Sequence, residues 1–105
     1  MERIEAEARL WRWQNMNDGP GGWYFLTIEG EAADAIRLAA MTGQWLEGRR
    51  GFGSARVTAT IGNTVWQTSV FPRKASGGWL LPVRAGVRKA EALEDGAMVR
   101  IMIAL

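Results

Sequence analysis

The sequence contains no cysteine and no histidine. Without cysteine the chain has no means of forming a disulfide, a zinc ribbon, an iron–sulfur cluster or a thiol nucleophile. Without histidine it lacks the commonest general base and transition-metal ligand, which excludes Ser-His-Asp and Cys-His catalytic arrangements. We therefore expect no metal, no cofactor and no catalytic residue. An enzyme that uses Lys, Arg or carboxylate groups stays open as an alternative, because these side chains also perform acid–base chemistry.

Long apolar runs are also missing from the chain. None approaches the ~20 residues that a membrane-spanning helix requires. The first five residues are rich in charge and are not followed by the apolar segment of a signal peptide. The sequence therefore predicts a cytoplasmic protein with no membrane partner.

Size and composition favour one soluble globular domain over residues 1–105. The chain has 105 residues, of which 48% are hydrophobic, and this is a common size for a single domain. Residues 1–48 carry 4 Lys/Arg and 8 Asp/Glu, whereas residues 49–105 carry 9 Lys/Arg and 3 Asp/Glu. Such a division is compatible with an anion-binding face. The simpler interpretation is that the two halves lie side by side and their charges intermix on the surface.

Alternation of apolar and polar residues predicts a mainly β fold. Arg3 to Leu10 alternates strictly, while Trp11 and Trp13 continue with the opposite phase, which suggests a bulge near Leu10. Gly62-Asn63 is typical of a two-residue hairpin turn. Further strands are expected at 23–28, 56–61, 64–71, 79–83 and 98–103. Short helices are expected at 31–41 and 85–93, where alanine is frequent and proline is absent.

Two parts of the chain resemble each other, which predicts an internal repeat of about 3–50 and 56–104. Arg3-Ile4-Glu5-Ala6 matches Arg56-Val57-Thr58-Ala59, and Trp13-Gln14 matches Trp66-Gln67 at the same offset. Gly21-Gly22-Trp23 matches Gly77-Gly78-Trp79 after a small shift. Each half would form a hairpin, a strand, a helix and a closing strand. Two such units would bury each other's open sheet edges in a pseudo-two-fold barrel that closes as a monomer.

Two strings within the second half are specific enough to indicate a family. Residues 66–72 read WQTSVFP and residues 81–90 read LPVRAGVRKA, with Asp95-Gly96 following. With these strings the chain resembles a bacterial domain-of-unknown-function family, the one numbered nineteen-oh-five. The resemblance implies a double-split β-barrel, a fold similar to that of AbrB-type regulators and MazE-type antitoxins. It also implies DNA binding as an analogy, although Thr27 replaces Pro82 in the first half and argues against a symmetric DNA-binding surface.

Basic side chains and tryptophans are the candidate contact residues. The basic set, which could hold an anion or the phosphates of a nucleic acid, comprises Arg49, Arg50, Arg73, Lys74, Arg84, Arg88 and Lys89. Its simpler interpretation is a solvated loop and helix face. Trp13, Trp23, Trp66 and Trp79 occupy repeated positions and are expected to fill the barrel interior. Trp11 and Trp45 lie outside the core pattern and are better candidates for exposed contacts.

The absence of the usual catalytic groups, combined with the frequency of Trp and Arg, favours a non-catalytic ligand-binding or interaction module. Its partner would be an unknown ligand or another protein. Nucleic-acid binding and an enzyme of unknown reaction are the alternatives.

Overall fold

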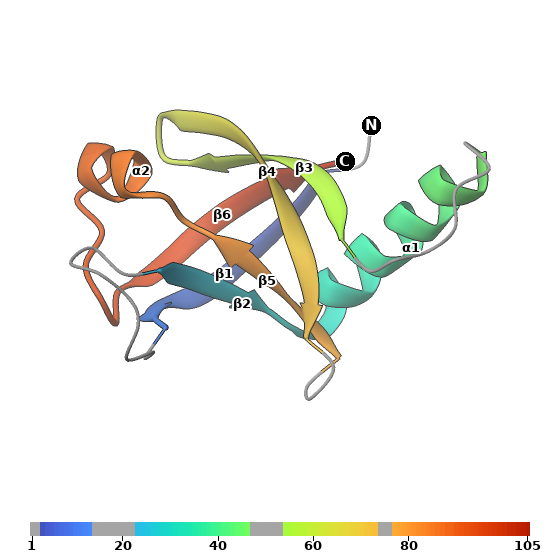
Figure 1. Ribbon diagram of the computed structural model, residues 1–105, viewed down its shortest axis with the longest axis horizontal. Coiled ribbons are helices and arrows are strands. Elements are labelled where there is room, and N and C mark those ends of the chain that lie inside the picture. The colour runs from blue at the N-terminus through green and yellow to red at the C-terminus, as the bar shows by residue number, and fades with distance from the viewer. Residues whose placement is uncertain (1–2, 14–22, 47–53, 74–76) are drawn as a thin grey trace.

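A computed structural model describes residues 3–13, 23–46, 54–73 and 77–105, with side chains in the first helix up to Met41. The chain is ordered β1 (Arg3–Arg12), β2 (Tyr24–Ile28), α1 (Gly30–Leu46), β3 (Ala55–Ile61), β4 (Thr64–Arg73), β5 (Gly78–Pro82), α2 (Ala85–Ala90) and β6 (Met98–Ala104) (Figure 1). The predicted mainly β barrel with two helices is therefore confirmed. No helix in the described part of the chain has the length and apolarity needed to cross a membrane.

The strands form a closed antiparallel barrel in the order β1-β2-β5-β4-β3-β6. β1 closes it, because its first part pairs with β6 (Ile4 opposite Ile103) and its last part pairs with β2 (Leu10 opposite Leu26). Closure leaves no open sheet edge, and unpaired edges are the usual route to aggregation of β proteins. The expected hairpin is present, since Ile61 faces Thr64 across Gly62-Asn63.

The core is formed by the inward-facing row of each strand. Leu10, Leu26, Leu81, Ile101 and Ile103 are fully buried. On β1 the alternation continues without a shift, so that even-numbered residues up to Leu10 point inward and the odd-numbered residues point outward. The predicted bulge near Leu10 is wrong, because the Leu10–Leu26 pair is followed by regular pairs up to Arg12.

The tryptophans in the repeated positions divide into two pairs. Trp66 and Trp79 belong to the core, as expected. Trp13 and Trp23 are 42% and 61% exposed, so the expectation that all four fill the interior is wrong. The physical reason is position: Trp13 and Trp23 lie just beyond the paired ends of β1 and β2, where the barrel interior ends.

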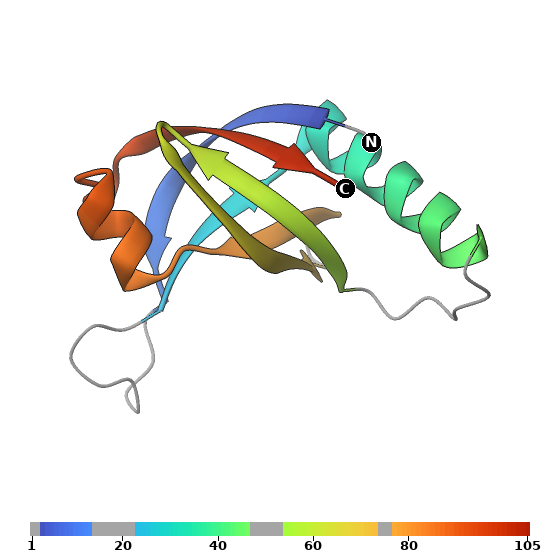
Figure 2. The ribbon, with the colours of Figure 1, turned by 90° about the horizontal axis from the view of Figure 1, so that it is seen from above.

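The helices lie at opposite ends of the barrel (Figure 1). α1 buries Ala33 and Ile36 against the core, and the Trp79 indole N–H donates to the Ala33 carbonyl oxygen at 3.0 Å. The later turns of α1 extend away from the barrel (Figure 2). α2 buries Val87 at the other end. It is shorter than the expected 85–93, because Ala92 takes a left-handed conformation (φ 53°) and ends the helix.

The internal repeat stays a prediction. Among the described residues, 3–46 contain two strands and one helix, whereas 55–104 contain four strands and one helix. Trp13 and Trp66, which match in sequence, also differ in position: Trp13 follows the end of β1, and Trp66 is buried within β4. The described elements therefore do not display two equal halves.

Candidate functional site: the aromatic face of the barrel

On one side of the barrel, most outward residues of β2, β5 and the neighbouring ends of β1 and β4 are aromatic or aliphatic. Trp11 pairs with Phe25, which pairs with Pro82. In the next outward row of the sheet, Thr27 of β2 pairs with Leu80 of β5, and Leu80 pairs with Phe71 of β4. We call this surface the aromatic face; it comprises Trp11, Trp13, Phe25, Thr27, Phe71, Arg73, Leu80 and Pro82. Phe71 and Trp13 are 45% and 42% exposed, so large ring surfaces meet solvent here.

Three rings of the aromatic face contact one another. The Trp11 and Phe25 ring centroids are 5.3 Å apart, and those of Trp11 and Trp13 are 6.1 Å apart. Trp13 meets Phe25 edge-on, with centroids 6.3 Å apart and planes at 72°. Offset and edge-to-face geometries are the favourable ones for aromatic pairs. The three rings therefore form a mutually supported cluster on the outside of the barrel.

Thr27 fixes the orientation of the Trp11 ring. The Trp11 indole N–H donates to Thr27 Oγ1 at 2.8 Å, and Arg73 Nη1 donates to the same oxygen at 3.5 Å. The Arg73 guanidinium carbon also lies 5.9 Å from the Trp11 ring centroid, within the range of a cation–π contact. A threonine hydroxyl thus links a cation and an indole, so that a positive charge is held beside the cluster.

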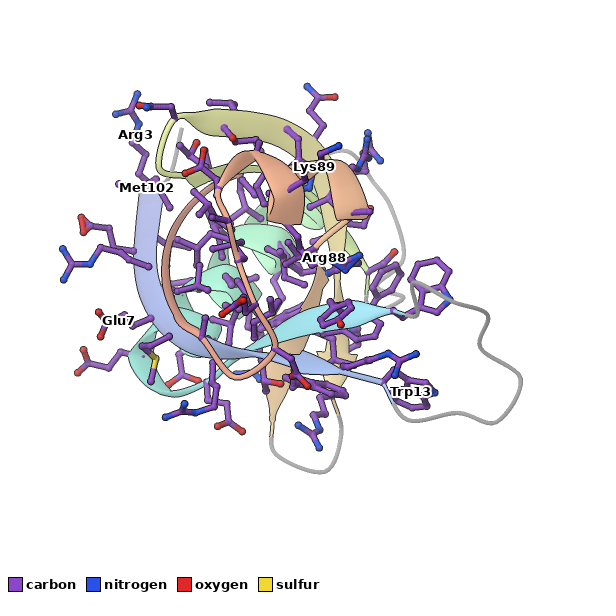
Figure 3. The ribbon with its side chains drawn as sticks, turned by 90° about the vertical axis from the view of Figure 1, so that its left-hand side faces the viewer. Arg3, Glu7, Trp13, Arg88, Lys89 and Met102 are labelled. Carbon is purple, nitrogen blue, oxygen red and sulfur yellow. The ribbon has the colours of Figure 1, made fainter. Side chains whose placement is uncertain are left out.

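The side of the barrel opposite the aromatic face carries charged residues. Figure 3 shows Arg3, Glu7 and Met102 on one side of the barrel and Trp13 on the other. The outward residues of the first part of β1 are charged, and Glu7 forms an ion pair with Arg100 of β6 at 3.6 Å. Arg9 donates to the Gly96 carbonyl oxygen at 2.7 Å. Mixed charges of this kind are typical of a surface that only meets water.

A shallow hollow lies beside α2, at the end of the barrel. It has a volume of about 470 Å³ and is lined by Tyr24, Ala85, Arg88, Lys89, Leu93, Glu94 and Asp95. The Arg88 guanidinium stacks on the Tyr24 ring at 3.9 Å, and its Nη1 is buried without a hydrogen-bond partner among the described residues. The two cations of the hollow are matched by two carboxylates, so its formal charge is zero.

The basic residues named from the sequence do not form one patch in the described part of the chain. Arg73 lies at the end of β4, opposite the first residue of β5, whereas Arg84 lies two residues beyond the last residue of β5. Arg84 and Lys89 are exposed, and Arg88 is half-buried. Arg49, Arg50 and Lys74 lie outside the described residues, and so does the side chain of Trp45.

Trp11 is the one predicted aromatic contact residue with a described side chain, and it is half-buried within the ring cluster. Sequence reasoning missed Phe25, Thr27, Phe71 and the row that they form. The strand sequences hold no signal specific to that row, because β2, β4 and β5 contain no Asp or Glu but neither do β3 and β6.

No group of three or more acidic side chains able to hold a metal ion occurs among the residues that the structure describes. What the aromatic face offers chemically is stacking surface, one threonine hydroxyl and one guanidinium. Groups of these types can stack on a flat ring, form a hydrogen bond and pair with an anion.

Comparison with known proteins identifies the family and leaves its activity open. No curated protein matches the chain. Residues 7–103 match the family model described as "Domain of unknown function (DUF1905)". This match covers nearly the whole barrel, from β1 to β6. It agrees with the family indicated by the WQTSVFP and LPVRAGVRKA strings, and the chain therefore belongs to the DUF1905 family.

Proposed function

We propose that this protein is a non-catalytic binding module and that its contact surface is the aromatic face. The observation that carries the proposal is the contrast between the two sides of the barrel. The side formed by β6 and the first part of β1 has charged outward residues and an ion pair. On β2, β5 and the end of β4, the outward residues Phe25, Leu80, Pro82 and Phe71 are aromatic or aliphatic. Contiguous exposed apolar patches on soluble proteins usually mark interaction sites.

The residue types on this face support binding. Trp and Arg are enriched among the residues that contribute most to binding energy at interfaces. Trp11 has its indole N–H bonded to Thr27 and its ring packed on Phe25, so little of its conformational freedom remains to be lost when a partner arrives. The absence of histidine and cysteine from the chain agrees with a role that needs no acid–base or nucleophilic group.

The experiment uses protein labelled with 5-fluorotryptophan, with each fluorine NMR signal assigned from single Trp→Phe variants. The labelled protein is titrated with single-stranded oligothymidylate, with a proline-rich peptide and, separately, with increasing concentrations of itself. We expect at least one titration to shift the Trp11 and Trp13 signals. The signals of the buried Trp66 and Trp79 should hardly move, which provides the internal reference.

A matched pair of variants on β4 tests whether the aromatic face is the surface that binds the partner. Phe71 and Val65 are both exposed residues of β4, but only Phe71 belongs to the aromatic face. Phe71→Ala should weaken the response of Trp13, and Val65→Ala should leave it unchanged. The proposal fails if no titration shifts Trp11 or Trp13 more than Trp79.

A further inference from the structure

We propose that the partner held on the aromatic face is a single-stranded nucleic acid, with bases stacked on its exposed rings and a phosphate held by Arg73. This inference rests on the proposed function, since it names the occupant of the same surface.

The charge of the aromatic face is complementary to an anion. β2, β4 and β5 contain no Asp or Glu, and Arg73 is the charged residue that they contribute. Its guanidinium lies beside the Trp11 ring rather than in an ion pair with a carboxylate of a described residue. A cation that forms no ion pair with a described carboxylate, next to a stacking surface, suits the sugar–phosphate backbone of a single strand.

The exposed aromatic rings provide surfaces on which the bases of a single strand can stack. Stacking of bases on aromatic side chains is a general device for holding single strands, because every base has a π face. Phe71 and Trp13 keep 45% and 42% of their surface exposed, and Trp13 lies against the rings of Trp11 and Phe25. Bases in a duplex are already stacked and paired and cannot lie on these rings, so the face selects single strands.

A second copy of the chain is a poorer partner for the aromatic face, because of the charge of Arg73. A symmetric dimer places the same patch of both subunits in contact. Two aromatic faces would bring two Arg73 side chains into an apolar interface, and the residues of the face itself include no carboxylate to neutralise them. Burial of unpaired charges is strongly unfavourable.

The hollow beside α2 is not part of the proposed path. Arg88 and Lys89 line it, but Glu94 and Asp95 line it as well. Like-charge repulsion from the two carboxylates opposes the approach of a phosphate. The inference therefore assigns the backbone contact to Arg73 and not to the cations of α2.

The test is fluorescence anisotropy of a fluorescein-labelled oligothymidylate about 12 nucleotides long, titrated with the full chain at several salt concentrations. The same strand annealed to its complement serves as the duplex probe. Trp13→Ala should weaken single-strand binding about tenfold. Arg73→Ala should reduce the slope of log affinity against log salt by about 0.7. Arg3→Ala, an exposed arginine on the opposite side (Figure 3), is the charge-matched control and should change neither.

The inference is overturned if the oligothymidylate fails to bind at low salt, if the duplex binds equally well, or if Arg3→Ala weakens binding as much as Arg73→Ala. Circular dichroism of each variant shows whether it retains the barrel. The fluorotryptophan spectra show whether the nucleic-acid inference alone fails or whether the proposed function fails with it. If Trp13 responds to the proline-rich peptide or to self-association but not to the oligonucleotide, the surface binds a different partner. If Trp13 responds to none of them, both proposals fail.

Discussion

At the scale of single residues, Gly78 and Thr27 determine the local structure around the aromatic face. Gly78 begins β5, and a β-carbon at this position would lie 2.4 Å from the Ile28 carbonyl oxygen and 3.0 Å from the Glu29 side chain. Thr27, one residue before Ile28, accepts the hydrogen bond that orients Trp11. The absence of a side chain at Gly78 thus permits the close approach of β5 to the end of β2, while the Thr27 hydroxyl sets the orientation of Trp11.

Gly78→Ala is expected to destabilise the barrel by about 2 kcal/mol, because the backbone carbonyl of Ile28 must move to admit the methyl group. Gly86→Ala is the matched control. Open space surrounds Gly86 and it lies within α2, so alanine there should be neutral or stabilising by about 0.5 kcal/mol. Urea unfolding of both variants measures the difference. Equal stability of the two variants would contradict the close approach of β5 and β2.

Thr27→Val is expected to cost about 1 kcal/mol of stability while the barrel is retained, because valine has the shape of threonine without its acceptor oxygen. The Trp11 ring would lose the partner that orients it. Its fluorotryptophan signal should therefore shift and broaden, while that of Trp79 stays in place. Thr60→Val on β3 is the control and should leave the Trp11 signal unchanged. An unaltered Trp11 signal in Thr27→Val would show that the hydroxyl does not orient the ring.

At the scale of elements, α1 is attached to the barrel by a narrow stripe. Ala33 and Ile36 are buried, Trp79 bonds to the Ala33 carbonyl oxygen, and Arg37 donates to the carbonyl oxygen of Gly77. On another side of the same helix, Met41 is 60% exposed. The attachment of α1 to β5 therefore depends on a few side chains in its first two turns.

Ile36→Ala is expected to lower the free energy of unfolding by about 3 kcal/mol, because it leaves a cavity at a fully buried position. Met41→Ala should change it by less than about 0.5 kcal/mol, since exposed positions contribute little. Thermal unfolding followed by circular dichroism at matched protein concentration gives both values. A small effect of Ile36→Ala would mean that α1 does not close this end of the barrel.

Much of this element-scale description could be predicted from the sequence, and the limits have physical causes. Period-two alternation and the Gly62-Asn63 turn indicated the strands and the hairpin, because these signals are local. Trp11 was named as a candidate for an exposed contact, but the outward direction of Trp13 was not predicted, because an outward tryptophan breaks the rule that large apolar residues point inward. The row from Thr27 to Leu80 to Phe71 depends on the pairing of β2 with β5 and of β5 with β4, which the sequence alone does not specify.

At the scale of the whole molecule, the barrel has a single core and two unlike sides. β1 contributes to both sides, since its outward residues change from Glu5 and Glu7 to Trp11 along one strand. The same strand closes the barrel by pairing with β6 and then with β2. The charged side and the aromatic face are therefore rigidly connected through one continuous strand.

Because all six strands share this core, unfolding is expected to be one cooperative transition. Urea unfolding followed by tryptophan fluorescence should coincide with unfolding followed by far-ultraviolet circular dichroism. Separate midpoints for the two signals would indicate that part of the barrel unfolds independently of the core.

The most direct test of the binding surface is a map of backbone amide chemical shifts on addition of the oligothymidylate. The account predicts that the largest changes fall on the outward residues Phe25, Phe71 and Leu80, and that Glu7 and Arg100 on the opposite side hardly change. Largest changes on β6 or α2, or no change on the aromatic face at saturating oligonucleotide, would contradict it.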